Sequence, residues 1–274
     1  KAALNSVTLD STGDTKDRSG NWNNGGPQTY TLTVGEEKID LSQKNLGSAD
    51  VALVAAWLKR PEVSTVLTSM NCLNNPLGEG VHTIIKVFEE TPRIRTLCGL
   101  DEGVEQIDWS KSGKRPADVA LLAAELKAGR AVAAVARLSL NGNMITGSFS
   151  RFGDWTYDKD LSGLIALCDA LLNLKNPIEL DLSNCGLSVN GVNPVAKAIS
   201  AGAAVAAINV LSNPIGDGAN LLIDIFESTE SIRTMLGIED GTTALDFSDG
   251  RYGQSKLDTG CAKLLAAEFK ARRC

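Results

Sequence analysis

One short pattern recurs eight times along the chain and constrains its fold more than any other feature. In each copy two apolar residues flank one polar residue, and a small residue and another apolar residue usually follow at fixed spacing. Alternation of this kind predicts a short strand with one buried face. Eight similar units, most of them 28 to 37 residues apart, indicate a repeat protein whose units stack on one another. The copies begin at Val7, Ile39, Met70, Ile107, Leu138, Leu180, Ile208 and Leu245.

The copies resemble a known repeat. Residues 180–187 read Leu-x-Leu-x-x-Cys-x-Leu, similar to the core of the leucine-rich repeats, L-x-x-L-x-L-x-x-N/C-x-L. The resemblance covers nearly the whole chain, and the helical segments between copies favour the ribonuclease-inhibitor-like class. It implies an α/β solenoid: a curved parallel β-sheet with helices on its convex side. Lys44 and Gly250 stand where Asn or Cys is usual, so we expect a weaker side-chain ladder there.

The repeats are themselves arranged as a duplication. Residues 75–103 align with 213–241 without a gap, and 13 of the 29 positions are identical. We therefore expect a single solenoid over residues 1–274, built from two four-repeat blocks at about 1–134 and 135–274. All eight strands should then lie parallel in one continuous sheet.

Helices are expected in the apolar segments between the strand copies, which Ala and Leu dominate. The predicted ranges are about 48–59, 78–90, 116–128, 161–174, 191–201, 216–228 and 256–271. Pro116 suits the first turn of its helix, because a proline there loses no hydrogen bond.

Each block carries an insertion after its first strand, at about 13–33 and 147–160. Both insertions contain Arg-x-Gly-Asn/Asp-Trp followed by a Tyr, and the Gly, Asn and Pro density over 20–28 predicts turns and a hairpin. Protein interfaces concentrate their binding energy in Trp, Tyr and Arg. The candidate partner-binding residues are therefore Arg18, Trp22, Tyr30, Arg151, Trp155 and Tyr157. The alternative is that each Trp folds back over an adjacent helix.

A second candidate surface is the row of outward residues on the strands. Every second strand places an aspartate there, and these lie roughly 10 Å apart if the strands are neighbours. Such a row could attract a basic partner, although the aspartates could equally accept hydrogen bonds from neighbouring residues. The spacing is too wide for a calcium site, which needs six or more oxygens on one ion. The predicted acidic row is Asp40, Asp108, Asp181 and Asp246.

Composition argues against several function classes. The net charge of -6 and the pI of about 5.0 disfavour nucleic acid as a partner, and no apolar run approaches the roughly 18 residues of a membrane span. His82 is the only histidine, and the chain contains neither a C-x-x-C pair nor a P-loop. We therefore expect no catalysis, no cofactor and no metal. The six cysteines are predicted to be structural thiols, which suggests an intracellular, reducing compartment.

The favoured function is protein–protein interaction, as a scaffold or accessory subunit of a larger assembly. One alternative is a regulatory or sensing leucine-rich-repeat module of a longer signalling protein. A third is a GTPase-activating protein, since one such family uses this repeat class, but its catalytic signature is not matched here. Solenoids usually cover their ends with polar-faced caps. Neither end of this chain shows one, so we expect either a longer chain or ends that dock on something else.

Overall fold

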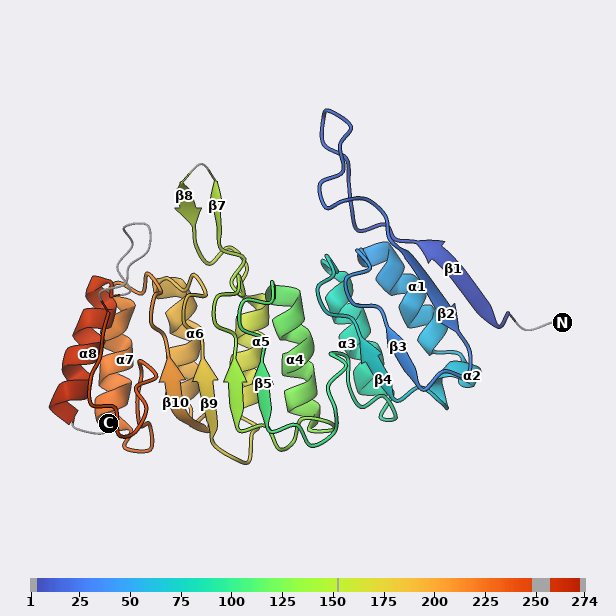
Figure 1. Ribbon diagram of the computed structural model, residues 1–274. Coiled ribbons are helices and arrows are strands. Elements are labelled where there is room, and N and C mark those ends of the chain that lie inside the picture. The colour runs from blue at the N-terminus through green and yellow to red at the C-terminus, as the bar shows by residue number, and fades with distance from the viewer. Residues whose placement is uncertain (1–3, 152, 248–256, 272–274) are drawn as a thin grey trace. The chain divides into compact units, whose positions relative to one another are not determined.

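A computed structural model describes residues 4–151, 153–247 and 257–271, and the chain forms two compact units (Figure 1). Unit 1 comprises Lys1–Gly103 and Ala120–Val132, and unit 2 comprises Val104–Val119 and Ala133–Cys274. Helix α4 (Pro116–Ala128) contributes residues to both. That the whole chain forms one solenoid stays a prediction.

Unit 1 contains two separate pairs of strands. Strands β1 (Ser6–Asp10) and β2 (Thr29–Thr33) form an antiparallel hairpin, whereas β3 (Lys38–Asp40) and β4 (Ser69–Asn71) pair in parallel. The helices of this unit, besides its part of α4, are α1 (Ser48–Leu58), α2 (Pro61–Ser64) and α3 (Gly80–Glu90). Helices α1 and α3 pack against each other.

Unit 2 is built on a four-stranded parallel sheet in the order β10-β9-β6-β5. Its strands are β5 (Gln106–Asp108), β6 (Arg137–Ser139), β9 (Ile178–Asp181) and β10 (Val205–Asn209). Its helices α5 (Ser162–Leu171), α6 (Val189–Ser200), α7 (Gly218–Ser228) and α8 (Thr259–Ala271) line up on one side of the sheet (Figure 1). No described helix covers the other face of the sheet (Figure 1). A small antiparallel hairpin, β7 (Phe149–Arg151) and β8 (Asp154–Thr156), projects beyond the carboxyl ends of the strands (Figure 1).

The strand alternation predicted from the sequence is confirmed in both units. Of the inward side chains in unit 2, Leu138, Leu140 and Leu182 are fully buried, and Leu180 and Ile208 nearly so. The seven predicted helices are also present, with ends that differ by up to three residues. The sequence analysis missed α2, a single turn that begins at Pro61.

The first and the eighth copies of the pattern do not form the predicted parallel strands. The first copy is β1, which pairs antiparallel with β2, because the chain returns along it after the insertion. Its apolar residues Val7 and Leu9 are only half-buried. In the eighth copy, Leu245–Phe247 has no strand structure, and Gly250 lies outside the described residues. The strands β3 and β4 also form a two-stranded sheet separate from the four-stranded sheet of unit 2. The prediction of eight parallel strands in one continuous sheet is therefore wrong, at both ends and between the two units.

A buried asparagine links successive strand turns, as the repeat pattern predicts. In unit 2 the Asn213 amide donates to the carbonyls of Leu182 and Val210 at 2.8 and 3.0 Å. Its Oδ1 accepts from the backbone N–H groups of Cys185 and Leu187 at 2.9 and 3.0 Å. Asn143 in unit 2 and Asn75 in unit 1 make corresponding contacts. One side chain thus satisfies four backbone groups that water cannot reach.

We expect Asn213→Ala to lower the free energy of unfolding by about 1–3 kcal/mol, the cost of leaving buried backbone groups without partners. Chemical denaturation followed by circular dichroism measures the change. The matched control is Asn173→Ala, because that exposed amide makes one contact, to the carbonyl of Asp169. Equal stability of the two variants would contradict the ladder role.

Candidate functional site

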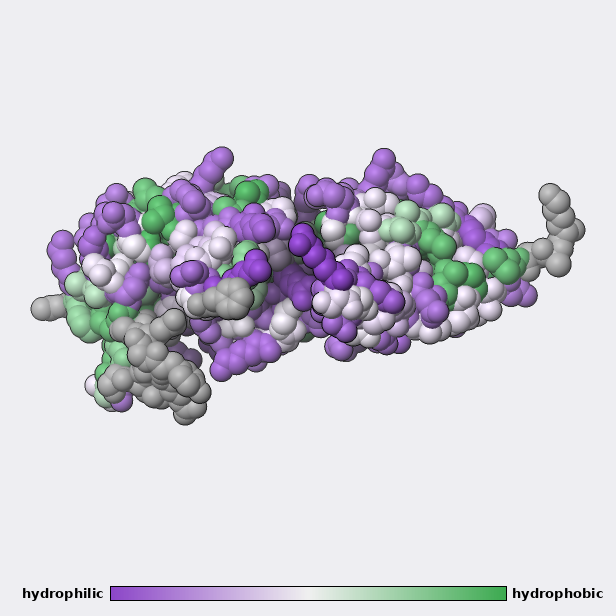
Figure 2. All heavy atoms as spheres, turned by 90° about the horizontal axis from the view of Figure 1, so that it is seen from above, coloured by the Kyte–Doolittle hydropathy of each residue, from purple (hydrophilic) through white to green (hydrophobic). Residues whose placement is uncertain are grey.

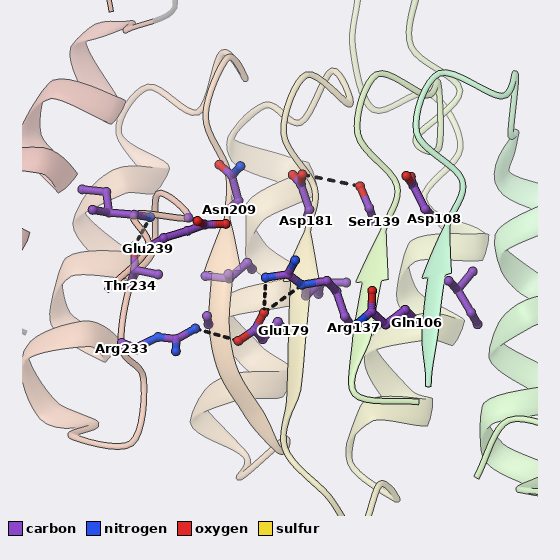
Figure 3. Close-up of a pocket in the computed structure, with 16 residues that line it drawn as sticks. Gln106, Asp108, Arg137, Ser139, Glu179, Asp181, Asn209, Arg233, Thr234 and Glu239 are labelled. Carbon is purple, nitrogen blue, oxygen red and sulfur yellow. Dashed lines mark hydrogen bonds and ion pairs between the residues drawn. The ribbon is translucent and has the colours of Figure 1, made fainter. Parts of the chain in front are cut away.

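The open face of the unit 2 sheet carries a row of polar side chains at the carboxyl ends of its strands. Figure 3 shows Asp108, Ser139, Asp181 and Asn209 side by side along this row. Three of these side chains accept a hydrogen bond from the backbone N–H of the residue two positions later in the sequence. These contacts are Asp108–Ser110, Asp181–Ser183 and Asn209–Leu211, at 2.9, 2.9 and 3.1 Å. The turn after each of these strands therefore holds the side chain in place.

A charged network lies two residues earlier on the same face. Glu179 on β9 accepts from Arg137 on β6, with the closest nitrogen at 2.7 Å, and from Arg233 at 2.7 Å (Figure 3). The two guanidinium groups hold the pKa of the Glu179 carboxyl below its ordinary value. Arg233 also lies 3.5 Å from Asp240.

These two rows line a shallow hollow of about 380 Å³. Its wall beyond β10 is the segment from Arg233 to Glu239, which includes Thr234 and Gly237. Gly237 has φ +67, and a Cβ there would lie 2.8 Å from the Cβ of Asn209, so no larger residue fits without a shift. The lining offers fixed acceptors and two arginines, which suits recognition of polar groups.

Unit 1 repeats this arrangement on a smaller sheet. A hollow of about 370 Å³ is lined by Asp40 and Asn71 at the strand ends, and by Arg95, Thr96 and Glu102 opposite them. Arg95 corresponds to Arg233 in the duplication. It pairs with Glu102 at 2.5 Å and donates to the Arg130 carbonyl at 2.8 Å. The two hollows therefore have corresponding linings but different ion pairs, since Arg95 pairs with Glu102 and Arg233 pairs with Glu179.

The wall of each hollow is held by a buried glutamate. In unit 2, Glu268 on α8 accepts from Thr234 Oγ1 at 3.0 Å and from the backbone of Met235 and Leu236. In unit 1, Glu125 on α4 makes the same three kinds of contact with residues 96–98. The sequence signal that could have revealed the pair is the string Leu-Leu-Ala-Ala-Glu, which occurs at both 121–125 and 264–268.

The predicted acidic row is only partly assembled. Asp108 and Asp181 lie on one sheet, with Ser139 between them, and Ser139 Oγ lies 3.5 Å from Asp181 Oδ2. Asp40 belongs to unit 1. Asp246 lies in the non-strand segment at the eighth copy, and it makes an interaction of its own. The described structure therefore supports a mixed polar row in unit 2 and not a line of four carboxylates.

The first insertion separates its predicted partner-binding residues. Trp22 is 43% exposed and Arg18 is also exposed, but Tyr30 is buried, at 3% exposure. The Tyr30 hydroxyl donates to Asp50 at 3.1 Å, and desolvation together with that carboxylate raises the pKa of the phenol. Tyr30 therefore belongs to the core, because it lies on the inward face of β2. The Trp22 ring is covered by the ammonium of Lys16, 4.8 Å from its centre.

The second insertion keeps its aromatic residues at the surface. Trp155 and Tyr157 are 38% and 37% exposed, and their rings stack in parallel at 5.6 Å. Arg151 at the end of β7 is exposed, and it already interacts with another group of the chain. Viewed onto the carboxyl ends of the strands, hydrophobic residues form separate patches in a largely hydrophilic surface (Figure 2). The alternative, in which each insertion tryptophan folds back over an adjacent helix, is not observed, because Trp22 and Trp155 are both exposed.

Catalytic and membrane features were also sought in the described residues. The His82 side chain is 70% exposed and lies 3.8 Å from Glu79. Burial raises the pKa of Cys72, Cys168 and Cys185 to about 12, so these thiols stay protonated and unreactive. The Cys98 and Cys261 side chains are also buried and form no disulfide among the described residues, and Cys274 lies outside those residues. Within the described ranges there is no cluster of three metal-binding side chains, and no helix there is long and apolar enough to cross a bilayer.

Comparison with known proteins found no family model that matches the chain and no matching curated protein. The structure defines a mixed α/β protein with a four-stranded parallel sheet. Its function has to be argued from the surfaces described above.

Proposed function

We propose that this chain is a leucine-rich-repeat solenoid that binds other proteins and catalyses no reaction, as a scaffold or accessory subunit. The asparagine ladder, the strand–helix alternation and the sequence duplication support the repeat assignment. The open hollows support recognition, because both are shallow and lined by side chains fixed in hydrogen bonds. The exposed histidine and the protonated thiols favour binding over nucleophilic catalysis.

The observation that carries this proposal is the exposed aromatic pair on the β7–β8 hairpin. Trp155 and Tyr157 stack on each other in a hairpin that projects from unit 2, although each could gain stability by burial. Neighbouring Phe149 and Met144 are also exposed, at 40% and 42%. Large aromatic residues held rigidly at a surface are typical anchors of protein interfaces.

The test is affinity purification from the source cells with the wild-type chain and a Trp155→Ala/Tyr157→Ala variant. We expect a partner that the wild type retains and that binds the variant at least about tenfold more weakly, as loss of a hot spot requires. The matched control is Leu221→Ala on α7, which removes a side chain that is 44% exposed. Equal retention by all three proteins, or a fall in unfolding temperature confined to the double variant, would contradict the proposal.

A further inference from the structure

Three of the four tryptophans hold a cation of their own chain over the indole ring. The pairs are Lys16–Trp22, Arg60–Trp57 and Lys114–Trp109, at 4.8, 4.4 and 5.3 Å from the ring centre. The fourth, Trp155, stacks instead on Tyr157, and no described residue places a cation over it. A ring–cation contact of this kind is a favourable interaction, strongest for Trp. Trp155 is therefore the tryptophan whose ring is open to a cation from outside.

The two insertions show how this difference arises. Each places its Trp just after a turn that contains a positive-φ glycine, Gly20 or Gly153. Across the first hairpin Trp22 pairs with Lys16, whose ammonium reaches the ring. Across the second, Trp155 pairs with Ser150, whose side chain is short and uncharged. The duplicated motif thus carries its own cation in unit 1 and lacks one at the same cross-strand position in unit 2.

A hollow of about 310 Å³ opens beside Trp155 and Tyr157. Its remaining lining comes from Met144 and from residues of the turns after β9 and β10 and before α8: Asn184, Gly186, Ser212, Asn213, Pro214 and Asp258. Asp258 supplies a carboxylate, and none of the described residues that line the hollow is cationic. That carboxylate is fixed by the backbone N–H groups of Cys261 and Gly216, at 2.6 and 3.2 Å. The hollow therefore combines an aromatic wall with a fixed negative charge.

We propose that this hollow receives an arginine side chain of a protein partner. The planar guanidinium stacks on aromatic rings, and its five N–H donors suit a site with a carboxylate and polar side chains. A purely apolar side chain would displace water from the Asp258 carboxylate without offering it a hydrogen bond, and this desolvation costs free energy. This inference rests on the proposed protein-binding function and names the chemistry of the partner.

The test uses acetyl-arginine-amide as the probe and the indole N–H signals of the protein in ¹⁵N nuclear magnetic resonance. We expect the Trp155 signal to move during the titration while those of Trp57 and Trp109 stay in place. Acetyl-citrulline-amide has nearly the same shape without the charge, and we expect it to bind roughly two- to fivefold more weakly, the ratio typical of an exposed cation–π contact. A stationary Trp155 signal, or equal binding of the two probes, would overturn the proposal.

Two exposed substitutions give matched controls. Ser150→Lys supplies unit 2 with the cation that Lys16 provides in unit 1, so it should abolish the response of Trp155 to the probe. Lys16→Ser removes that cation from Trp22, so the Trp22 signal should gain a response. Both positions are exposed hairpin residues, and circular dichroism checks that folding is retained. If neither variant alters the response, the ring is not the binding site.

The outcomes also separate this inference from the proposed function. A partner that is lost with Trp155→Ala/Tyr157→Ala but retained by Ser150→Lys would support the protein-binding function and overturn the arginine site. Probe binding at Trp155 without any partner in the purification would support the site and contradict the function.

Discussion

Replacing Leu182 with alanine should lower the free energy of unfolding by about 2–5 kcal/mol, the range for truncating a packed core leucine. Leu182 follows β9 directly, and its side chain is fully buried between the sheet and the helices of unit 2. Its carbonyl also accepts the Asn213 amide, so a shift of the backbone would disturb the ladder. Leu140, which occupies the same place after β6, should respond alike.

The measurement is urea denaturation of the whole chain followed by circular dichroism and by Trp fluorescence. Leu172→Ala is the matched control, because that leucine is 43% exposed just after α5 and a surface substitution costs about 0.5 kcal/mol or less. In a repeat protein each unit is stabilised by its neighbours. We therefore expect amide exchange to quicken in β6 and β10 as well as in β9. An effect confined to residue 182, or no effect, would contradict the inward assignment.

The sequence predicted the local fold well wherever one short pattern decided the structure. The inward pair at 138–140 and 180–182 follows from alternation, and the role of Asn213 follows from the spacing after its strand. The helices followed because apolar segments of ten or more residues fill the gaps between the strand copies. Such features depend on neighbours within a few residues, so one sequence is enough to reveal them.

Features that depend on distant partners were not predictable in this way. The first copy of the pattern, at Val7 and Leu9, fits as well as the other copies do. Its strand β1 nevertheless pairs with β2, which returns beside it in the antiparallel direction. Tyr30 was grouped with the surface aromatics because it follows Trp22. It is instead buried, because it lies on the inward face of β2 and its hydroxyl reaches Asp50. Pairing choices of this kind are decided by tertiary contacts between segments that are separated in sequence.

In the candidate surfaces, too, the sequence predicted local features but not those that depend on residues from separate repeats. The sequence identified Trp155 and Tyr157, and both are exposed and adjacent in the structure. It did not identify the Arg137–Glu179–Arg233 network, because these residues come from separate repeats and only the sheet brings them together. The outward position of every second strand copy carries an Asp, so a row of four requires seven consecutive parallel strands. The structure has no such sheet among its described residues, because β3 and β4 pair separately and the eighth copy is not a strand.

The second large effect is expected at Glu125, whose carboxylate is fully buried. Its Oε1 accepts hydrogen bonds from Thr96 Oγ1 at 2.8 Å and from the backbone of Leu97 and Cys98 at 2.5 and 2.7 Å. Glu125→Ala leaves these three donors without an acceptor, and we expect a loss of about 3–5 kcal/mol, at the severe end for a point substitution. Glu125→Gln keeps one acceptor oxygen and should lose less. Glu268→Ala provides the equivalent test in unit 2.

The pH dependence of Glu125→Gln tests whether the buried group is a carboxyl with an altered proton affinity. Desolvation raises the pKa of Glu125 above its ordinary value and outweighs the hydrogen bonds that lower it. A carboxyl with a raised pKa in the folded state favours folding fully below its unfolded pKa, about 4.3. That contribution is lost as the pH rises through the folded pKa. The wild type should therefore lose stability relative to Glu125→Gln between acid and neutral pH, because the variant has no proton to release.

The measurement is the free energy of unfolding of both proteins at a series of pH values from about 4 to 8, a window that spans the unfolded pKa. The expected result is a difference between variant and wild type that moves in favour of the variant as the pH rises. The nearby Cys72 thiol does not titrate in this window, because burial raises its pKa to about 12. A constant difference, or one that moves in favour of the wild type, would show that the three hydrogen bonds outweigh burial and keep the carboxylate ionised. Glu125 would then stabilise the wall of the unit 1 hollow as a permanent anion.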